Sequence, residues 1–162
     1  MFTESIPKRT KHGTVNIPER LKAFNDTQYF AVLATNDAGH PYTSLISFAI
    51  TPDMKKIIFA TPKQTQKFRN IVKTKDISIL IDNRSRVRSN LMATEAITII
   101  GKAKYIRKSE YREELAKIFL KKHQMLEEFL HSDTTALIVV NLTRCIHVCK
   151  FQSVSVWEVE HS

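Results

Sequence analysis

Little in this sequence suggests a flexible, cross-linked or membrane-spanning chain. The 162 residues include only 3 glycines and 5 prolines, which leaves little room for long linkers. The 2 cysteines lack the spacing of a disulfide framework and fit a reducing, cytoplasmic compartment. No uncharged apolar run approaches the ~18 residues of a membrane span, and the first residues lack the apolar stretch of a secretory signal. We therefore expect one cytoplasmic domain over 1–162, with 1–17 as a flexible or partner-contacting arm.

Acidic residues are outnumbered by basic ones, which bears on the partners of the chain. Lys and Arg total 25 against 16 Asp and Glu, giving a net charge of +9. Such a chain can attract nucleic acid, an anionic membrane surface or a phosphorylated small molecule. The basic residues gather at 8–11, 63–75 and 84–88 rather than on one recognition helix, and no zinc-finger pattern accompanies them. This distribution disfavours a nucleic-acid partner.

Apolar periodicity and turn residues predict a mainly β chain. Successive hairpins favour antiparallel pairing, and closure into a barrel would remove exposed strand edges. Gly101 lies inside a strand and predicts a bulge or bend, whereas the apolar run 76–82 predicts a strand buried on both faces. The predicted helices cover 18–28, a segment from 65 onward, and 109–130; the predicted strands cover 29–35, 41–51, 57–61, 76–82, 94–107, 134–141, 144–150 and 153–159.

Two of the predicted helices have an apolar side that should face the core. In the helix that starts near Thr65, this side comprises Phe68, Ile71 and Val72. Ser109 is the expected N-cap of the helix over 109–130. The buried stripe of that helix is predicted to contain Leu115, Ile118, Phe119, Met125, Leu126 and Phe129.

The segment "ATPKQTQKFRNI" (60–71) combines a strand end with a cationic helix start. The first N–H groups of a helix are unpaired and carry partial positive charge, so they can bind a phosphate. Thr65 would cap this helix and Lys67 would add a full charge, with Thr61 beside them. Arg69, four residues past the cap, is expected to point elsewhere. A capped surface helix with solvated cations is the alternative interpretation.

The segment "RCIHVCK" places Cys145, His147 and Cys149 on one face of a strand, in steps of about 6.6 Å. That spread is large compared with zinc–ligand bonds of about 2.0–2.3 Å. We therefore predict no metal site and favour buried or interface side chains, and the role of these three residues stays open.

Four segments, in this order, resemble the FMN-binding split barrels related to pyridoxamine 5'-phosphate oxidase. They are "FAVLATNDAGHPYTSLISFAI", "KKIIFATPKQTQKFRNI", "DISILIDNRS" and "AITIIGKAKYI", and the likeness runs from about residue 28 to 105. The resemblance implies an antiparallel split β-barrel with helices. It also implies a homodimer that binds FMN at the subunit interface, with the strand face near 42–47 and the last strands contacting the partner.

The resemblance also assigns roles to individual positions. Thr65 and Lys67 match the residues that hold the FMN phosphate, and Trp157 would cover a flavin face or fill a core edge. The remaining implied flavin contacts are Tyr42, Thr43, Ser44 and Leu45 on one strand, Ala60 and Thr61 at the end of another, and Asn83, Arg84 and Ser85 in a later loop.

Departures from the family pattern argue against the named oxidase activity. Gln66 stands where many members have Arg, and Tyr42 and Ala96 stand where the oxidase has Arg and Gln. The ending "VWEVEHS" also lacks the oxidase's Arg-Leu-x-Pro-like tail. We predict a small FMN-dependent oxidoreductase with a small-molecule substrate; the substrate, the electron donor and the choice between FMN and another flavin stay open. The alternatives are a non-catalytic flavin-binding or stress-related protein and a basic nucleic-acid-binding barrel.

Overall fold

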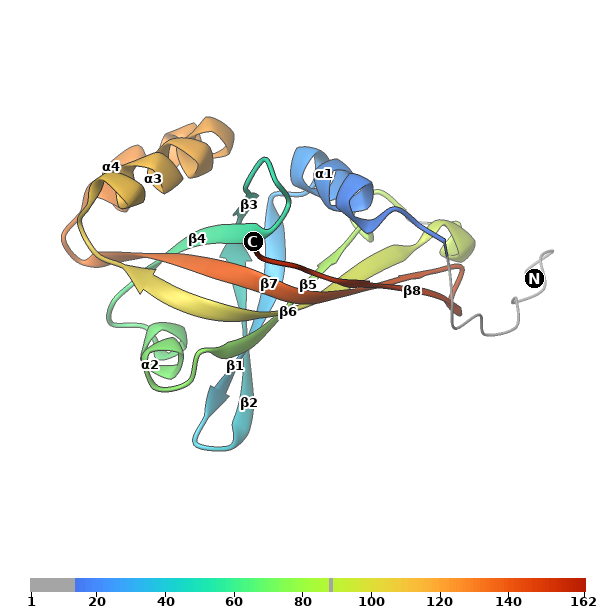
Figure 1. Cartoon of the computed structure of the whole chain (residues 1–162), viewed down its shortest axis with the longest axis horizontal. Coiled ribbons are helices and arrows are strands. Elements are labelled where there is room, and N and C mark those ends of the chain that lie inside the picture. Colours follow the sequence, from blue (N-terminus) through green and yellow to red (C-terminus); the bar gives the residue numbers. More distant parts are fainter. Residues whose placement is uncertain (1–13, 88) are drawn as a thin grey trace.

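The computed structural model describes residues 14–87 and 89–162 (Figure 1). The longer helices are α1 (Ile17–Thr27), α2 (Gln66–Lys73) and α3 (Glu110–Lys122), and three shorter ones are η1 (Leu91–Ala93), η2 (Gln124–Leu126) and α4 (Glu127–His131). The strands are β1 (Phe30–Asp37), β2 (His40–Ser47), β3 (Ala49–Ile50), β4 (Lys56–Pro62), β5 (Asp76–Asp82), β6 (Glu95–Ile106), β7 (Thr135–Cys149) and β8 (Ser153–Glu158).

The eight described strands form one curled antiparallel sheet. Its order is β2-β1-β5-β6-β7-β4-β3, and β8 pairs with the second half of β7. The sheet curls until β2 approaches β4, so that its two ends come together. The predicted antiparallel split β-barrel is confirmed.

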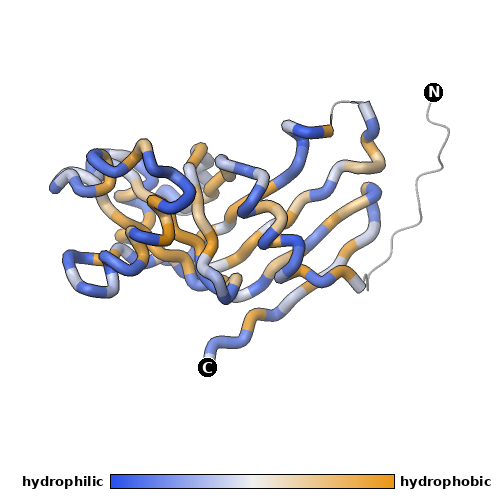
Figure 2. Tube along the Cα trace, turned by 90° about the horizontal axis from the view of Figure 1, so that it is seen from above, coloured by the Kyte–Doolittle hydropathy of each residue, from blue (hydrophilic) through white to orange (hydrophobic). Residues whose placement is uncertain are grey.

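Apolar residues pack on both sides of the long strands. Strands β1, β5 and β6 alternate between buried and more exposed positions, whereas β4 and the first half of β7 are almost continuously apolar and buried (Figure 2). The larger core fills the barrel and is covered by α1 through Leu21 and Phe24. The smaller core lies between the sheet and α3, around Phe119, Leu130 and Ile58.

The predicted irregularity at Gly101 is a β-bulge. Pairing between β6 and β7 shifts register between Ile100 and Gly101, opposite Thr143. The hydroxyl of Thr143 donates to the carbonyl of Ile100 at 3.0 Å. Thr143 is thus an extra residue of β7 without a partner on β6. From this point on, the residues of β7 that face inward change from even-numbered to odd-numbered positions. This change makes one strand of 15 residues look like two, so the predicted division into 134–141 and 144–150 is wrong.

The predicted helix over 109–130 is also interrupted. Ser109 caps α3 as expected, accepting from the N–H of Arg112 at 3.1 Å. The helix ends at Lys122, and the buried ring of its C-cap, His123, places Nε2 2.7 Å from the carbonyl oxygen of Phe48. The chain then turns through η2 into α4. Because of this turn Met125 is 93% exposed, contrary to prediction, and Leu130 is fully buried.

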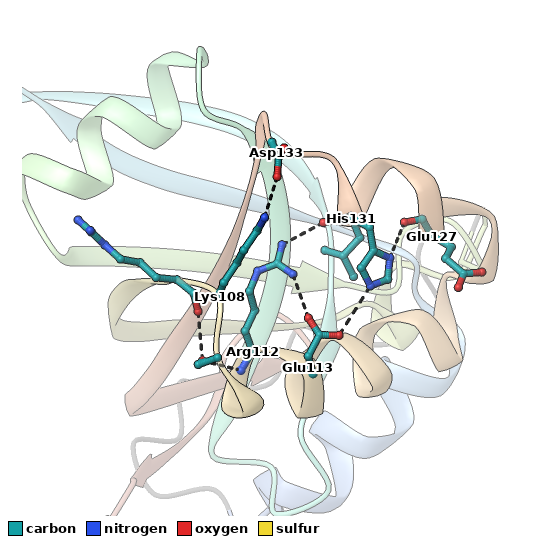
Figure 3. Close-up of polar contacts among 9 residues, drawn as sticks. Lys108, Arg112, Glu113, Glu127, His131 and Asp133 are labelled. Atoms are coloured by element: carbon teal, nitrogen blue, oxygen red, sulfur yellow. Dashed lines mark hydrogen bonds and ion pairs between the residues drawn. The ribbon is translucent and has the colours of Figure 1, made fainter.

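Arg112 holds the α3–α4 corner together (Figure 3). Its guanidinium is buried and donates to the carbonyl of Leu130 at 3.0 Å. The same group lies 3.6 Å from Glu113, which in turn lies 3.8 Å from His131. A buried charge is tolerated when its donors are paired, so this network stabilises the returning helix.

Two further burial predictions are wrong. Val72 on α2 is 61% exposed, because only Ile71 and part of Phe68 face the barrel. Strand β5 is buried on one face only. Its residues Ile77 and Ile79 point into the core, whereas Leu80 is 36% exposed on the outer surface of the sheet.

The predicted arm over 1–17 falls mostly outside the described residues. Of the residues at its end, Asn16 caps α1 by accepting from the N–H of Glu19, and Ile17 is buried in the core. No helix in the described part of the chain is long and apolar enough to cross a membrane.

Candidate functional site

The corner between β4 and α2 is built around two threonines. Thr61, one residue before the end of β4, is buried, and its hydroxyl lies 2.9 Å from the hydroxyl of Thr65. Thr65 is the N-cap of α2, as predicted: its Oγ1 accepts from the N–H of Phe68 at 3.3 Å and donates to the carbonyl of Pro62 at 2.9 Å. The N–H groups of Gln66 and Lys67 have no acceptor among the described residues. The helix therefore begins with donors available to an anion.

A buried polar side chain fixes α2 to the barrel. The Nδ2 of Asn70 donates to the hydroxyl of Thr35 on β1 at 3.0 Å, and its Oδ1 accepts from Gln66 at 2.8 Å. Asn70 is only 1% exposed, and its contact with Thr35 is shielded from water. Sequence reasoning missed Asn70 as a positioning residue. The available signal was its place beside Ile71 on the inward side of the helix.

Lys67 is the cation of this corner with the fewest partners. Its side chain is half-buried, and burial lowers the pKa of its ammonium group. Within residues 14–87 and 89–162, no carboxylate lies within ion-pair distance of it. A half-buried cation without a counter-ion is a favourable position for an anionic ligand.

The other two cations of the segment have partners. Lys63 donates to the carbonyl of Asp133 at 2.8 Å, on the side of the corner that faces α4. Arg69 donates to the carbonyl of Gln64 at 2.8 Å and to Gln66 at 2.9 Å. Arg69 thus folds back toward the start of the helix, and the expectation that it points elsewhere is wrong.

The predicted contact residues of β2 divide between the two faces of the strand. Tyr42 and Ser44 pair with Thr35 and Leu33, whose side chains are buried on the barrel side. Tyr42 and Ser44 therefore lie on the face shared with Thr35, the residue that binds α2. The Oγ of Ser44 is buried without a hydrogen-bond partner in the described chain.

Thr43 and Leu45 lie on the opposite, outer face of β2. Leu45 borders a cavity of about 390 Å³ that also contains Arg84 and Ser85. Arg84 forms an ion pair with Asp82 at 3.1 Å, and Ser85 donates to Gln28 at 3.1 Å. The structure therefore brings these predicted residues together, but on the other side of the sheet from Tyr42 and Ser44.

The side chains of three predicted contact residues form hydrogen bonds or packing contacts within the chain. Asn83 bridges the loop before β6, accepting from the N–H of Glu95 and donating to the carbonyl of Ala93, both at 2.9 Å. Ala60 packs into the smaller core below α3. Trp157 packs against the main core, beside the half of β7 (144–149) that does not pair with β4. Within one chain, Trp157 therefore lies apart from α2.

Of the three residues singled out on β7, Cys145 and His147 are interior and Cys149 is partly buried. Cys145 is fully buried, and burial raises the pKa of its thiol to about 12. His147 is 1% exposed and lies 3.5 Å from Glu95, which also binds Arg20. In the described part of the chain, no three His, Cys, Asp or Glu side chains are grouped closely enough to hold a metal ion.

Several solved structures have this fold. A heme-binding protein from Mycobacterium smegmatis superposes with a TM-score of 0.78 at 15% identity, covering 89% of this chain and 58% of that one. General Stress Protein 26 from Bacillus anthracis gives 0.66 at 15% identity, covering 90% and 100%. A FAD-binding protein from Mesorhizobium loti gives 0.65 at 9% identity, covering 82% and 94%. The chain thus spans little more than half the length of the mycobacterial protein.

A family model described as pyridoxamine 5'-phosphate oxidase matches residues 17–149, from the start of α1 to the end of β7. No curated protein matches the sequence. The matched region contains the β4–α2 corner and all predicted contact residues except Trp157. The chain therefore belongs to the family of pyridoxamine 5'-phosphate oxidase-like split-barrel proteins.

Proposed function

We propose that this protein binds FMN at the β4–α2 corner and acts as a small flavin oxidoreductase. The observation that carries the proposal is Lys67, a half-buried ammonium with no carboxylate partner in the described chain, beside the two unpaired N–H groups at the start of α2. Together they offer several donors to a phosphate monoester. The hydroxyl of Thr65 orders these donors by capping the helix.

The chemistry would come from the flavin, which accepts and donates electrons when bound. The residues of this chain would bind and orient it. Tyr42 and Ser44 share the barrel-side face of β2 with Thr35, which anchors α2 through Asn70. This arrangement supports a ligand that extends from the helix start along β2. This chain lacks the C-terminal Arg motif with which pyridoxamine 5'-phosphate oxidase holds the phosphate of its substrate. We therefore expect little turnover of pyridoxamine 5'-phosphate.

We also propose that the protein is a homodimer. A row of paired residues crosses six strands on the outer face of the sheet: Leu45, Val32, Leu80, Thr98, Ile146 and Val156. Leu45 is 62% and Val156 51% exposed, and Phe30 beside them is 58% exposed. A mostly apolar strip that crosses six strands on an exposed face favours contact with a second copy. It includes β2 and β8, the strands expected to meet the partner.

Light scattering of the purified protein tests the dimer. We expect the mass of two chains at micromolar concentration, and dissociation when Leu45→Lys places a charge at the β2 end of the strip. A wild-type protein with the mass of one chain would contradict this assembly.

Heme is the second candidate ligand, because solved structures of this fold include a heme-binding protein and a heme storage protein. The iron of heme is held by His, Cys, Met or Tyr side chains. None of Thr61, Thr65 and Lys67 is of these types, whereas all three suit a phosphate. The corner therefore favours flavin.

The absorption spectrum of the purified protein tests the cofactor directly. We expect the two-banded spectrum of an oxidised flavin, and a released compound with the mass of FMN after heating. A Soret band would support heme instead. A colourless protein that gains neither spectrum after incubation with FMN or hemin would reject both cofactors. Steeply salt-dependent binding of nucleic acid would then support the basic nucleic-acid-binding barrel.

Turnover separates the two flavin hypotheses. An oxidoreductase should oxidise a reduced nicotinamide at a rate above that of free FMN, measured by the loss of nicotinamide absorbance. A non-catalytic flavin carrier should not exceed the rate of free FMN.

A further inference from the structure

A cavity on the other side of the molecule from α2 has the chemistry of a ligand site. It measures about 570 Å³ and lies between α1, α3, β3 and the turn that follows β3. In Figure 1, α1 and α3 rise above the sheet at this point, whereas α2 lies below it. The size is within the range of small-molecule sites, about 300–1,000 Å³. Its wall consists of Lys22, Asn25, Asp26, Tyr29, Ala49, Ile50, Pro52, Met54, Ile118, Lys121 and Lys122.

Lys122 is the distinctive group in this wall. Its ammonium lies 3.8 Å from the centre of the Phe48 ring and 3.3 Å from Oδ1 of Asn25. Burial lowers the pKa of this ammonium to about 8, although the charge of Asp26 raises it slightly. An ammonium has three N–H donors. Among the described residues only Asn25 accepts one of them, and no carboxylate reaches ion-pair distance.

The surrounding charges leave the cavity positive. Lys22 and Asp26, both on α1, pair with each other at 2.9 Å. Lys121 and Lys122 on α3 have no such partner in the described chain. His123 lies next in sequence, but burial lowers its pKa and its Nε2 is bound to the carbonyl of Phe48. At neutral pH the wall therefore carries two cations that no carboxylate balances.

The rest of the wall is apolar. Ile50 of β3 and Ile118 of α3 both line the cavity, with Met54 at the turn. Tyr29 adds an aromatic ring on the α1 side and is 60% exposed. Apolar walls with a few convergent polar groups are typical of sites for amphipathic small molecules.

We propose that this cavity binds a small carboxylate with an apolar body, whose carboxylate pairs with Lys122 and whose body lies against Ile50 and Ile118. A carboxylate would supply the acceptors that the ammonium of Lys122 lacks, and water would leave the apolar wall. The site is separate from the β4–α2 corner and does not depend on the flavin proposal. Its ligand would be a second small molecule, acting as a substrate or an effector.

Calorimetry with octanoate tests the proposal on the full-length protein. We expect octanoate to bind in the micromolar to low millimolar range. Acetate, which lacks the apolar body, and octanol, which lacks the charge, should each bind at least about tenfold more weakly. Octanol that binds as tightly as octanoate would overturn the assignment, as would the absence of octanoate binding at millimolar concentration.

Variants on α3 test the role of Lys122. Lys122→Met should weaken octanoate binding by about tenfold or more, whereas Lys122→Arg should retain most of it. Lys117→Met is the matched control, since Lys117 is an exposed lysine of the same helix outside the cavity wall. An equal loss of octanoate affinity in Lys117→Met and Lys122→Met would contradict the site. General attraction of octanoate to a basic surface would then explain the binding.

The wild-type protein provides a test that does not depend on the folding of any variant. A group with a pKa of about 8 is roughly half protonated at pH 8. A bound carboxylate favours the charged form, so octanoate binding at pH 8 should take up as much as about half a proton, and almost none at pH 6. Binding heats measured in buffers of different ionisation enthalpy give this number. Release of protons at pH 8, or an uptake larger at pH 6 than at pH 8, would overturn the assignment to Lys122.

Discussion

Lys67→Ala should separate two ligands that share a ring system. FMN and riboflavin differ by one phosphate, and the proposed cradle consists of Lys67 and the free N–H groups at the start of α2. A hydrogen bond to a charged group contributes about 1.5–3 kcal/mol, so the variant should bind FMN about ten- to a hundredfold more weakly. Riboflavin affinity should change little, because the ring contacts remain. Both affinities can be measured by quenching of flavin fluorescence.

The control for this experiment must leave the helix start intact. Arg69 is unsuitable, since its guanidinium binds the carbonyl of Gln64 beside the cap. Lys73→Ala is better: this lysine is exposed in the last turn of α2. Thr65→Ala should weaken FMN binding more mildly, by the ~0.5–1.5 kcal/mol of a neutral hydrogen bond. Equal weakening of FMN and riboflavin in Lys67→Ala, or none in either, would refute the phosphate site.

Three further predictions concern stability. A Cβ on Gly101 would lie 2.6 Å from the carbonyl oxygen of Asn141, so Gly101→Ala should lower the free energy of unfolding by about 1–3 kcal/mol in urea titration; an unchanged midpoint would mean that the bulge relaxes freely. Leu130→Ala should lower the free energy of unfolding by about 2–5 kcal/mol and Met125→Ala by less than about 0.5 kcal/mol, because only Leu130 is buried. A larger loss in Met125→Ala would instead support the predicted continuous helix over 109–130. Burial lowers the pKa of both His123 and His147, so near pH 6 the unfolded chain binds more protons than the folded one. Stability should therefore be full above about pH 7 and fall as the pH drops through 6.5, and His147→Gln should reduce this slope; a slope of opposite sign would contradict the burial of these rings.

Features fixed by neighbouring residues could be predicted from the sequence. Thr65 and Ser109 cap the helices that follow them, because a cap needs only a hydroxyl within a few residues of the free N–H groups. The hairpin turn between β1 and β2 likewise depends on local chemistry: Gly39 adopts a φ of +91°, and its N–H is bound by the side chain of Asn36. Gly101 indicated the bulge before its position in the sheet was known.

Features fixed by distant residues could not be predicted in this way. The helix after Ser109 ends at Lys122, where the ring of the C-cap His123 is bound to a carbonyl 75 positions away in the chain. The helical pattern from 124 onward would have fitted a continuous helix equally well, so only the fold exposes Met125 and buries Leu130. The same holds for β7. Its inward-facing positions change at Thr143, and this change is recognised as a bulge only when β7 is paired with β6 at Gly101.

The candidate site likewise has features that neighbouring residues fix and features that distant residues fix. The residue types of the β4–α2 corner and the cap at Thr65 follow from a few consecutive positions, and the sequence alone determined them. The tertiary structure decided that Asn70 is buried against Thr35, that Arg69 turns back toward the cap, and that Lys67 is left without a carboxylate partner in the described chain. It also decided which face of β2 lines the barrel, and so placed Tyr42 on the barrel side and Leu45 on the outer side. These outcomes depend on which surfaces meet when the sheet curls, and contacts between distant segments leave no periodic signal in the chain.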